Sequence, residues 1–172
     1  MPATRRVVTA LNDDGKSYFA IDEPTPHVFD FGAAQFHEIW ADAGNLQPSE
    51  PLDKLSSDKT ALNPPVGGSI IRIFTLVPES QAAVTAELLE SMADRFDDGG
   101  AMEPDAPGFH TTPTIDYIIV LSGEVDLELD AGSVHLTPGD IVVQRATRHA
   151  WRVNGDQPCV MAGILISQPN LG

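Results

Sequence analysis

From residue 110 onwards the chain alternates short β-compatible segments with turn residues, and this pattern limits the possible folds more than any other feature. The segments "IDYIIVLSG", "EVDLELD", "SVHLT", "DIVVQ", "HAWRV" and "CVMAGILIS" are separated by connections such as "AG", "PGD" and "NGDQP". Strands this short, with no helix between them, indicate an antiparallel sandwich or barrel rather than a parallel sheet. We therefore predict an all-β fold.

The first 77 residues also have mostly β character. "RRVVTALN" and "SYFAID" predict a hairpin, because the Asp-Gly pair in "DDGK" between them suits a tight turn. "HVFDF", "FHEIWA" and the apolar run at 70–77 predict further strands, whereas residues 42–69 are rich in Pro, Ser, Gly and Asp and predict a long surface loop. We expect residues 1–69 to pack on a barrel formed by 70–172, within one domain overall.

One helix is predicted, over about 80–96. Val84, Leu88 and Met92 recur every four residues, and glycines follow the segment. The helix either packs against the sheet or acts as a lid. A lid is possible because "DDGGAMEPDAPG" behind the helix resembles a hinge and leads directly to a histidine.

The composition argues against two classes of binding partner. A formal net charge of −15 argues against nucleic acid or an anionic membrane as a partner. No run approaches the roughly 18 apolar residues that a membrane span needs, and no apolar run follows the N-terminal arginines as in a secretory signal. Cys159, the single cysteine, lies in an apolar stretch and is expected to be a buried thiol. We expect a cytoplasmic protein.

The segment "HTTPTIDYIIV" contains the best candidate site. His110, Thr112, Thr114 and Asp116 occupy alternate positions and lead into aliphatic residues of the same parity. Alternate side chains share one face of a strand. If the aliphatic residues face a barrel interior, the polar residues before them line its mouth.

Two stretches resemble the motifs of the cupin family. "HTTPTIDYIIVLSG" is similar to the first motif, and "GSVHLTPGDIVVQRATRHAWRV", with its Pro-Gly-Asp turn and later histidine, is similar to the second. The resemblance covers roughly residues 70–168, and it extends to a group of small single-domain cupins, of the cupin-2 conserved barrel type, whose functions are mostly unassigned. It implies a jelly-roll (double-stranded β-helix) barrel with one metal site, whose ligands come from both motifs.

The chain departs from the cupin pattern at three positions. Thr112 replaces a usual second histidine, Asp116 replaces a usual glutamate, and Val153 stands where asparagine is common. The resemblance therefore leaves His110, Asp116 and His149 as metal ligands.

Two imidazoles and a carboxylate can hold a divalent ion such as Fe, Zn, Mn or Ni. On a straight strand His110 and Asp116 would lie about 20 Å apart, so the chain must bend between them, and Pro113 is the predicted place. The alternative is a site that has lost its metal, with Asp116 hydrogen-bonded to a histidine or a backbone amide.

Five neighbours are candidate substrate contacts. Trp151 has the parity of His149 and either faces the cavity or is a core aromatic residue. Arg145 either pairs with an oxygen anion of the substrate or with a surface acid. The complete candidate set is Thr112, Thr114, Gln144, Arg145 and Trp151.

Three functions remain open from the sequence. The first is a metal-dependent enzyme, a dioxygenase, a lyase or decarboxylase, or an isomerase, acting on a small oxygenated or aromatic metabolite. The second is a metal-free acid/base enzyme in which a histidine and Asp116 move a proton. The third is a non-catalytic protein that binds a small molecule. We also expect a homodimer, with "RRVVTALN" as a candidate strand at the subunit interface.

Overall fold

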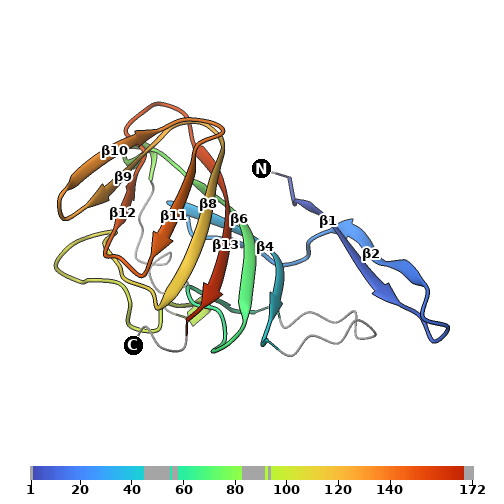
Figure 1. The fold of residues 1–172 in the computed structure, drawn as a ribbon. Coiled ribbons are helices and arrows are strands. Elements are labelled where there is room, and N and C mark those ends of the chain that lie inside the picture. The colour runs from blue at the N-terminus through green and yellow to red at the C-terminus, as the bar shows by residue number, and fades with distance from the viewer. Residues whose placement is uncertain (1, 45–54, 56–57, 83–91, 93, 169–172) are drawn as a thin grey trace.

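The structure, a computed structural model, describes residues 2–44, 55, 58–82, 92 and 94–168. Its strands follow one another along the chain with almost no helix in the described part (Figure 1). The elements are β1 (Arg5–Leu11), β2 (Ser17–Pro24), β3 (Val28–Asp30), β4 (Ala34–Asp42), β5 (Thr60–Ala61), β6 (Ser69–Leu76), the 3-10 turn η1 (Glu79–Gln81), β7 (Phe96–Asp97), β8 (Thr114–Ser122), β9 (Val125–Leu129), β10 (Gly132–Leu136), β11 (Ile141–Arg145), β12 (Ala150–Arg152) and β13 (Cys159–Ser167). This order confirms the all-β prediction.

Two antiparallel sheets form the barrel. The larger has the strand order β11-β8-β13-β6-β4-β3, and the smaller has the order β10-β9-β12. Alternate residues of β8 point inward, as the sequence pattern predicts, and Tyr117 between them is exposed. The core between the sheets consists of Phe74, Ile118, Val120, Val125, Leu127, Leu136, Val153, Cys159 and Met161.

The turn from β8 to β9 depends on a glycine. Gly123 has a φ of 72°, and a Cβ atom there would lie 2.3 Å from the carbonyl oxygen of Pro158. Glycine is therefore required both for the backbone conformation and for the close approach of the neighbouring chain. At this turn the chain passes from β8 in the larger sheet to β9 in the smaller one.

The N-terminal strands have two different positions. β1 and β2 pair only with each other and form the predicted hairpin, which extends away from the barrel (Figure 1). β3 and β4 instead continue the larger sheet beside β6. Thr4 anchors the base of the hairpin, because its backbone N–H and its hydroxyl both contact Nδ1 of His37 on β4.

Two sequence predictions for the middle of the chain are changed or left open. The loop predicted over 42–69 is interrupted, since Thr60 and Ala61 form β5 and pair in parallel with β7. The helix and lid predicted over 80–96 lie mainly outside the described residues, although Met92, Asp94 and Arg95 are helical. Across the described residues, no helix has both the length and the apolar character required to cross a bilayer.

Candidate functional site

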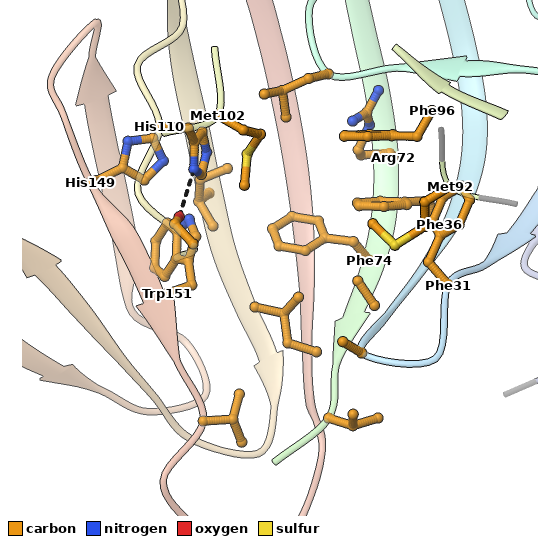
Figure 2. Close-up of a pocket in the computed structure, with 18 of the residues that line it drawn as sticks. Phe31, Phe36, Arg72, Phe74, Met92, Phe96, Met102, His110, His149 and Trp151 are labelled. Carbon is orange, nitrogen blue, oxygen red and sulfur yellow. Dashed lines mark hydrogen bonds between the residues drawn. The ribbon is translucent and has the colours of Figure 1, made fainter. Parts of the chain in front are cut away.

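A cavity of about 350 Å³ lies inside the barrel, bordered by both sheets and by the segment that precedes β8. Most of its wall is aromatic or aliphatic, which suits a small organic ligand. Figure 2 shows two histidines and Trp151 on one side, with an arginine and several phenylalanines on the other. The polar residues of the described lining are Arg72, Glu79, His110, Thr112, Asp116 and His149.

Two segments that are distant in sequence bring His110 and His149 together. The backbone N–H of each residue donates to the carbonyl oxygen of the other, and both distances are 3.0 Å. This antiparallel bridge places the two imidazole ring centroids 4.1 Å apart (Figure 2). The sequence predicted that these histidines from separate motifs share one site, and the structure brings them side by side.

Both imidazoles have a defined hydrogen-bonding pattern. His110 Nδ1 lies 3.0 Å from the carbonyl oxygen of Gly108, and His149 Nδ1 lies 2.9 Å from that of Thr147. A carbonyl oxygen can only accept, so each Nδ1 carries the hydrogen and each Nε2 keeps a lone pair. Burial lowers the pKa of both rings, that of His149 to about 4 with a further contribution from His110. Both rings are therefore neutral at pH 7.

Asp116 is a buried carboxyl group on β8 with 4% of its surface exposed. Burial raises its pKa to about 6, although hydrogen bonding from Thr114 and Thr112 and the positive charge of Arg72 act in the opposite direction. Its Oδ1 atom has no hydrogen-bond partner among the described residues. A buried carboxyl oxygen without a partner is an unsatisfied group that a ligand can engage.

The predicted set of three metal ligands is not assembled. The chain does change course near Pro113, because His110 bridges to His149 whereas β8 begins only at Thr114. Nevertheless, the described residues contain no group of three His, Cys, Asp or Glu side chains placed to hold one ion. Asp116 lines the same cavity, but it interacts with the two threonines and Arg72 rather than joining the imidazoles.

Two of the five predicted substrate contacts line the cavity. Trp151 lies edge-on to His149 with ring centroids 5.9 Å apart, and Thr112 lies on the same wall as Asp116. Thr114 is buried next to them and donates a hydrogen bond of 2.8 Å to the Thr112 hydroxyl. Thr112 therefore lines the polar end of the cavity directly, and Thr114 supports it from behind through this hydrogen bond.

The other two predicted contacts lie elsewhere. Gln144 is buried, but its amide donates to the carbonyl oxygen of Thr147 at 3.1 Å and also to the Thr147 hydroxyl, so it shapes the turn before His149. Arg145 alternates with Gln144 along β11 and is exposed. Neither residue is part of the described cavity lining.

Sequence reasoning missed Arg72. This residue lies in the middle of the apolar strand β6, has only 3% of its surface exposed and lines the cavity. Its Nη2 atom lies 3.2 Å from Oε1 of Glu38 and donates to the carbonyl oxygen of Ala61 at 2.6 Å. The available signal was an arginine at an inward position of a buried strand, because arginine is rarely buried unless it is paired.

The segment before β8 is held against the wall that carries His149. Glu103 accepts two hydrogen bonds from Arg148, of 2.7 and 2.8 Å. The guanidinium carbon of Arg148 lies 3.8 Å from the centroid of the Phe109 ring, and that of Arg152 lies 5.5 Å from it. Met102 of this segment lines the cavity beside His110 (Figure 2). A paired charge and an aromatic contact thus fix the segment that carries His110.

Comparison with known proteins gives three relevant similarities. Residues 98–166 match the cupin domain family. The chain is 29% identical over 156 residues to the phomopsin biosynthesis cluster protein C' of Diaporthe leptostromiformis, covering 86% of this chain and 69% of that protein. It is 39% identical over 69 residues to a cupin-domain-containing oxidoreductase, fogC, of Aspergillus ruber, covering 36% of this chain and 34% of that protein.

Among solved structures, the Schizosaccharomyces pombe Cnp3 cupin domain shares the fold. The TM-score is 0.50 over 95% of this chain and 88% of that chain, at 9% sequence identity. At this identity the likeness concerns the fold alone. The barrel described above is therefore the same architecture as that of a solved cupin domain.

Proposed function

We propose that this protein, whose residues 98–166 match the cupin domain family, is an enzyme that moves a proton on a small, largely apolar, oxygen-bearing molecule inside the barrel. The cavity volume of about 350 Å³ is within the range of small-ligand sites. The names of two similar proteins, a biosynthesis cluster protein and an oxidoreductase, support a role in small-molecule chemistry.

One observation carries this proposal: the usual order of proton affinities is inverted in the cavity. Burial raises the pKa of Asp116 to about 6 and lowers the pKa of His149 to about 4. Between these values the carboxyl group keeps its proton while the imidazole remains neutral. A proton donor and a proton acceptor then coexist without charge, which is the condition for concerted acid/base catalysis.

Each group has a defined role in this chemistry. An imidazole Nε2 atom, left free because Nδ1 donates to a backbone carbonyl, accepts a proton from carbon next to a substrate carbonyl. Asp116 donates its proton to the carbonyl oxygen, which gives an enol. Return of a proton to another carbon completes an isomerisation, whereas loss of a leaving group completes an elimination. The apolar wall excludes water and so strengthens both interactions.

Hydrogen exchange tests the proposal without knowledge of the natural substrate. The protein is incubated in D₂O with a panel of aromatic and aliphatic ketones, and deuterium uptake at carbon is followed by NMR. We expect catalysed exchange for some members, reduced about 100-fold or more in His149→Gln and Asp116→Asn. Arg145→Gln, an exposed control outside the cavity, should exchange normally. Ligand binding without exchange in any panel member would instead indicate a non-catalytic binding protein.

A metal-dependent enzyme is the second candidate, and one observation favours it. Metal-binding histidines usually donate their second ring nitrogen to a carbonyl or carboxylate, as His110 and His149 do. These two residues would hold the ion, which would supply Lewis-acid chemistry, but a third protein ligand is not gathered with them in the described part of the chain. Elemental analysis separates the candidates. About one equivalent of metal that is lost in His149→Gln supports the metal enzyme, and less than about a tenth supports the acid/base enzyme.

A further inference from the structure

We infer that Arg72 and the aromatic wall around it form the recognition end of the cavity, and that this end takes an uncharged aromatic molecule with a hydrogen-bond-accepting oxygen. The inference rests on the proposed function and deepens it by naming the chemical class of the ligand. It depends on three features of the cavity: an unsatisfied donor, flat aromatic surfaces and the balance of charge.

The unsatisfied donor is Nε–H of Arg72. The side chain is almost completely buried, and its Nη2 atom is already engaged by Glu38 and Ala61. Nε has no hydrogen-bond partner among the described residues. A buried donor without a partner is unfavourable, so an acceptor atom on a ligand would supply a bond that the protein itself does not.

The surfaces around Arg72 are flat and aromatic. Phe36 and Phe96 are stacked, with centroids 5.8 Å apart and planes inclined by 3°. Phe31 meets Phe96 edge-on at 5.7 Å, and the Arg72 guanidinium carbon lies 5.4 Å from the Phe36 centroid. Figure 2 shows this group on the side of the cavity opposite the two histidines. An aromatic ligand matches such a wall by stacking and edge contacts.

The charge balance disfavours an anion. The guanidinium of Arg72 is paired with the carboxylate of Glu38, with Nη2 3.2 Å from Oε1. Glu79, which also lines the cavity, has a side chain 68% exposed and pairs with Arg152. The charge of Arg72 is therefore already balanced within the wall, so a buried carboxylate on the ligand would lack a net positive partner.

Arg72 is a positioning residue in this arrangement. An oxygen bound at Arg72 holds one end of the ligand between the phenylalanines. Figure 2 shows the two imidazoles on the opposite side of the cavity, which is the side that the rest of the ligand faces.

Three probes of similar size test the inference: acetophenone, ethylbenzene and benzoate. Their dissociation constants are measured by calorimetry or by tryptophan fluorescence, to which Trp151 in the cavity wall contributes. We expect acetophenone to bind about 10-fold or more tightly than ethylbenzene, the range for a hydrogen bond to a charged donor. Benzoate should bind more weakly than acetophenone.

The double variant Glu38→Gln with Arg72→Met removes the donor without stranding a buried charge. The Glu38→Gln change neutralises the carboxylate that Arg72 would otherwise leave unpaired. The oxygen of the new amide can still accept the hydrogen bond that the Thr60 hydroxyl gives to Glu38. The preference for acetophenone over ethylbenzene should fall to about one, while ethylbenzene affinity is retained. Arg145→Met, an exposed control, should leave the preference intact.

Four results would overturn the inference. They are equal binding of acetophenone and ethylbenzene to the native protein, tighter binding of benzoate, persistence of the preference in the double variant, and failure of all three probes to bind. The proposed function fails separately, through absence of deuterium exchange. An Arg72-dependent preference without any exchange would keep the recognition site and remove the catalytic role.

Discussion

Burial acts on Asp116 and His149 in opposite directions, because one loses a negative charge and the other a positive charge when it becomes neutral. The pKa of Asp116 rises to about 6, against the effects of two threonines and Arg72. The pKa of His149 falls to about 4. A low dielectric surrounding thus favours the neutral form of both groups. Two predictions at the scale of single residues follow from these shifts.

Asp116→Asn should stabilise the folded protein at pH 7.5. The folded-state pKa of Asp116, about 6, is above the ordinary 3.8, so the folded state binds the extra proton and loses stability as pH rises through this interval. The variant avoids that loss, so its gain over the native protein should reach up to about 3 kcal/mol at pH 7.5. Near pH 3.5 the gain should vanish. Urea denaturation at both pH values measures it, and equal differences at the two values would contradict the assigned pKa.

The pH dependence of the exchange reaction should also report Asp116. As a proton donor it is active in its neutral form, so the rate should fall as pH rises above about 6. A second limb should appear below about pH 4, where His149 becomes protonated. The rate is measured with one responsive ketone from pH 3.5 to 8. A rate that increases through pH 6 would assign Asp116 the role of base instead.

At the scale of single elements, the turn between β8 and β9 has the clearest sequence requirement, a glycine at position 123. Gly123→Ala would force a Cβ atom to within 2.3 Å of the Pro158 carbonyl oxygen and impose a strained φ of 72°. We expect a loss of about 2 kcal/mol or more in the free energy of unfolding. Gly155→Ala is the matched control, because Gly155 has open space around its Cα and an ordinary φ. Similar unfolding midpoints for the two variants would contradict this role.

The segment that precedes β8 should loosen when its charged anchor is removed. Arg148→Met deletes both hydrogen bonds to Glu103 and weakens the contact with Phe109. Because the pair is partly exposed, global stability should change by less than about 1 kcal/mol. Amide hydrogen exchange over residues 101–110 should nevertheless become faster. Arg5→Met, which removes an exposed pair with Asp22 in the hairpin, should leave that segment unchanged.

Periodicity was sufficient to predict the strands but not every inward contact. β8 and β13 alternate buried and less buried residues along their length, so the sequence identified both strands and their faces. The short pairing of β5 with β7 depends on two residues of each strand, which is too little for a recognisable pattern. Local composition also favoured a loop there, and tertiary contact prevailed.

The candidate site was predicted in part, for a related reason. Two motifs identified His110 and His149, and strand parity identified Trp151. Arg72 belongs to neither motif, and its partner Glu38 comes from a different strand, so the pair is visible only once β4 and β6 are neighbours. The distance of Asp116 from the imidazoles depends on the bend near Pro113, which spacing along the chain does not determine.

At the scale of the whole molecule, the hairpin of β1 and β2 stands apart from the barrel, because the two strands pair only with each other. It extends from the barrel and exposes large apolar side chains, with Phe19 at 74% and Val7 at 48% (Figure 1). Exposed apolar groups of this size favour contact with another surface. We keep the prediction of a homodimer and assign the hairpin to its interface.

Light scattering tests that assignment. The native protein should have twice the chain mass of 18.4 kDa at micromolar concentration. Phe19→Asp should shift it towards the monomer, because a charge replaces the most exposed aromatic side chain of the hairpin. Asp13→Asn, an exposed change in the hairpin turn, serves as the control. A native monomer, or a dimer unaffected by the Phe19 change, would exclude this interface.

One reciprocal pair of backbone hydrogen bonds, between His110 and His149, holds the two imidazoles next to each other. A motion that moves the segment carrying His110 away from the segment carrying His149 therefore also separates the two rings. If a ligand enters the cavity by this route, its entry would also separate the two imidazoles. The open form of the protein would therefore be inactive.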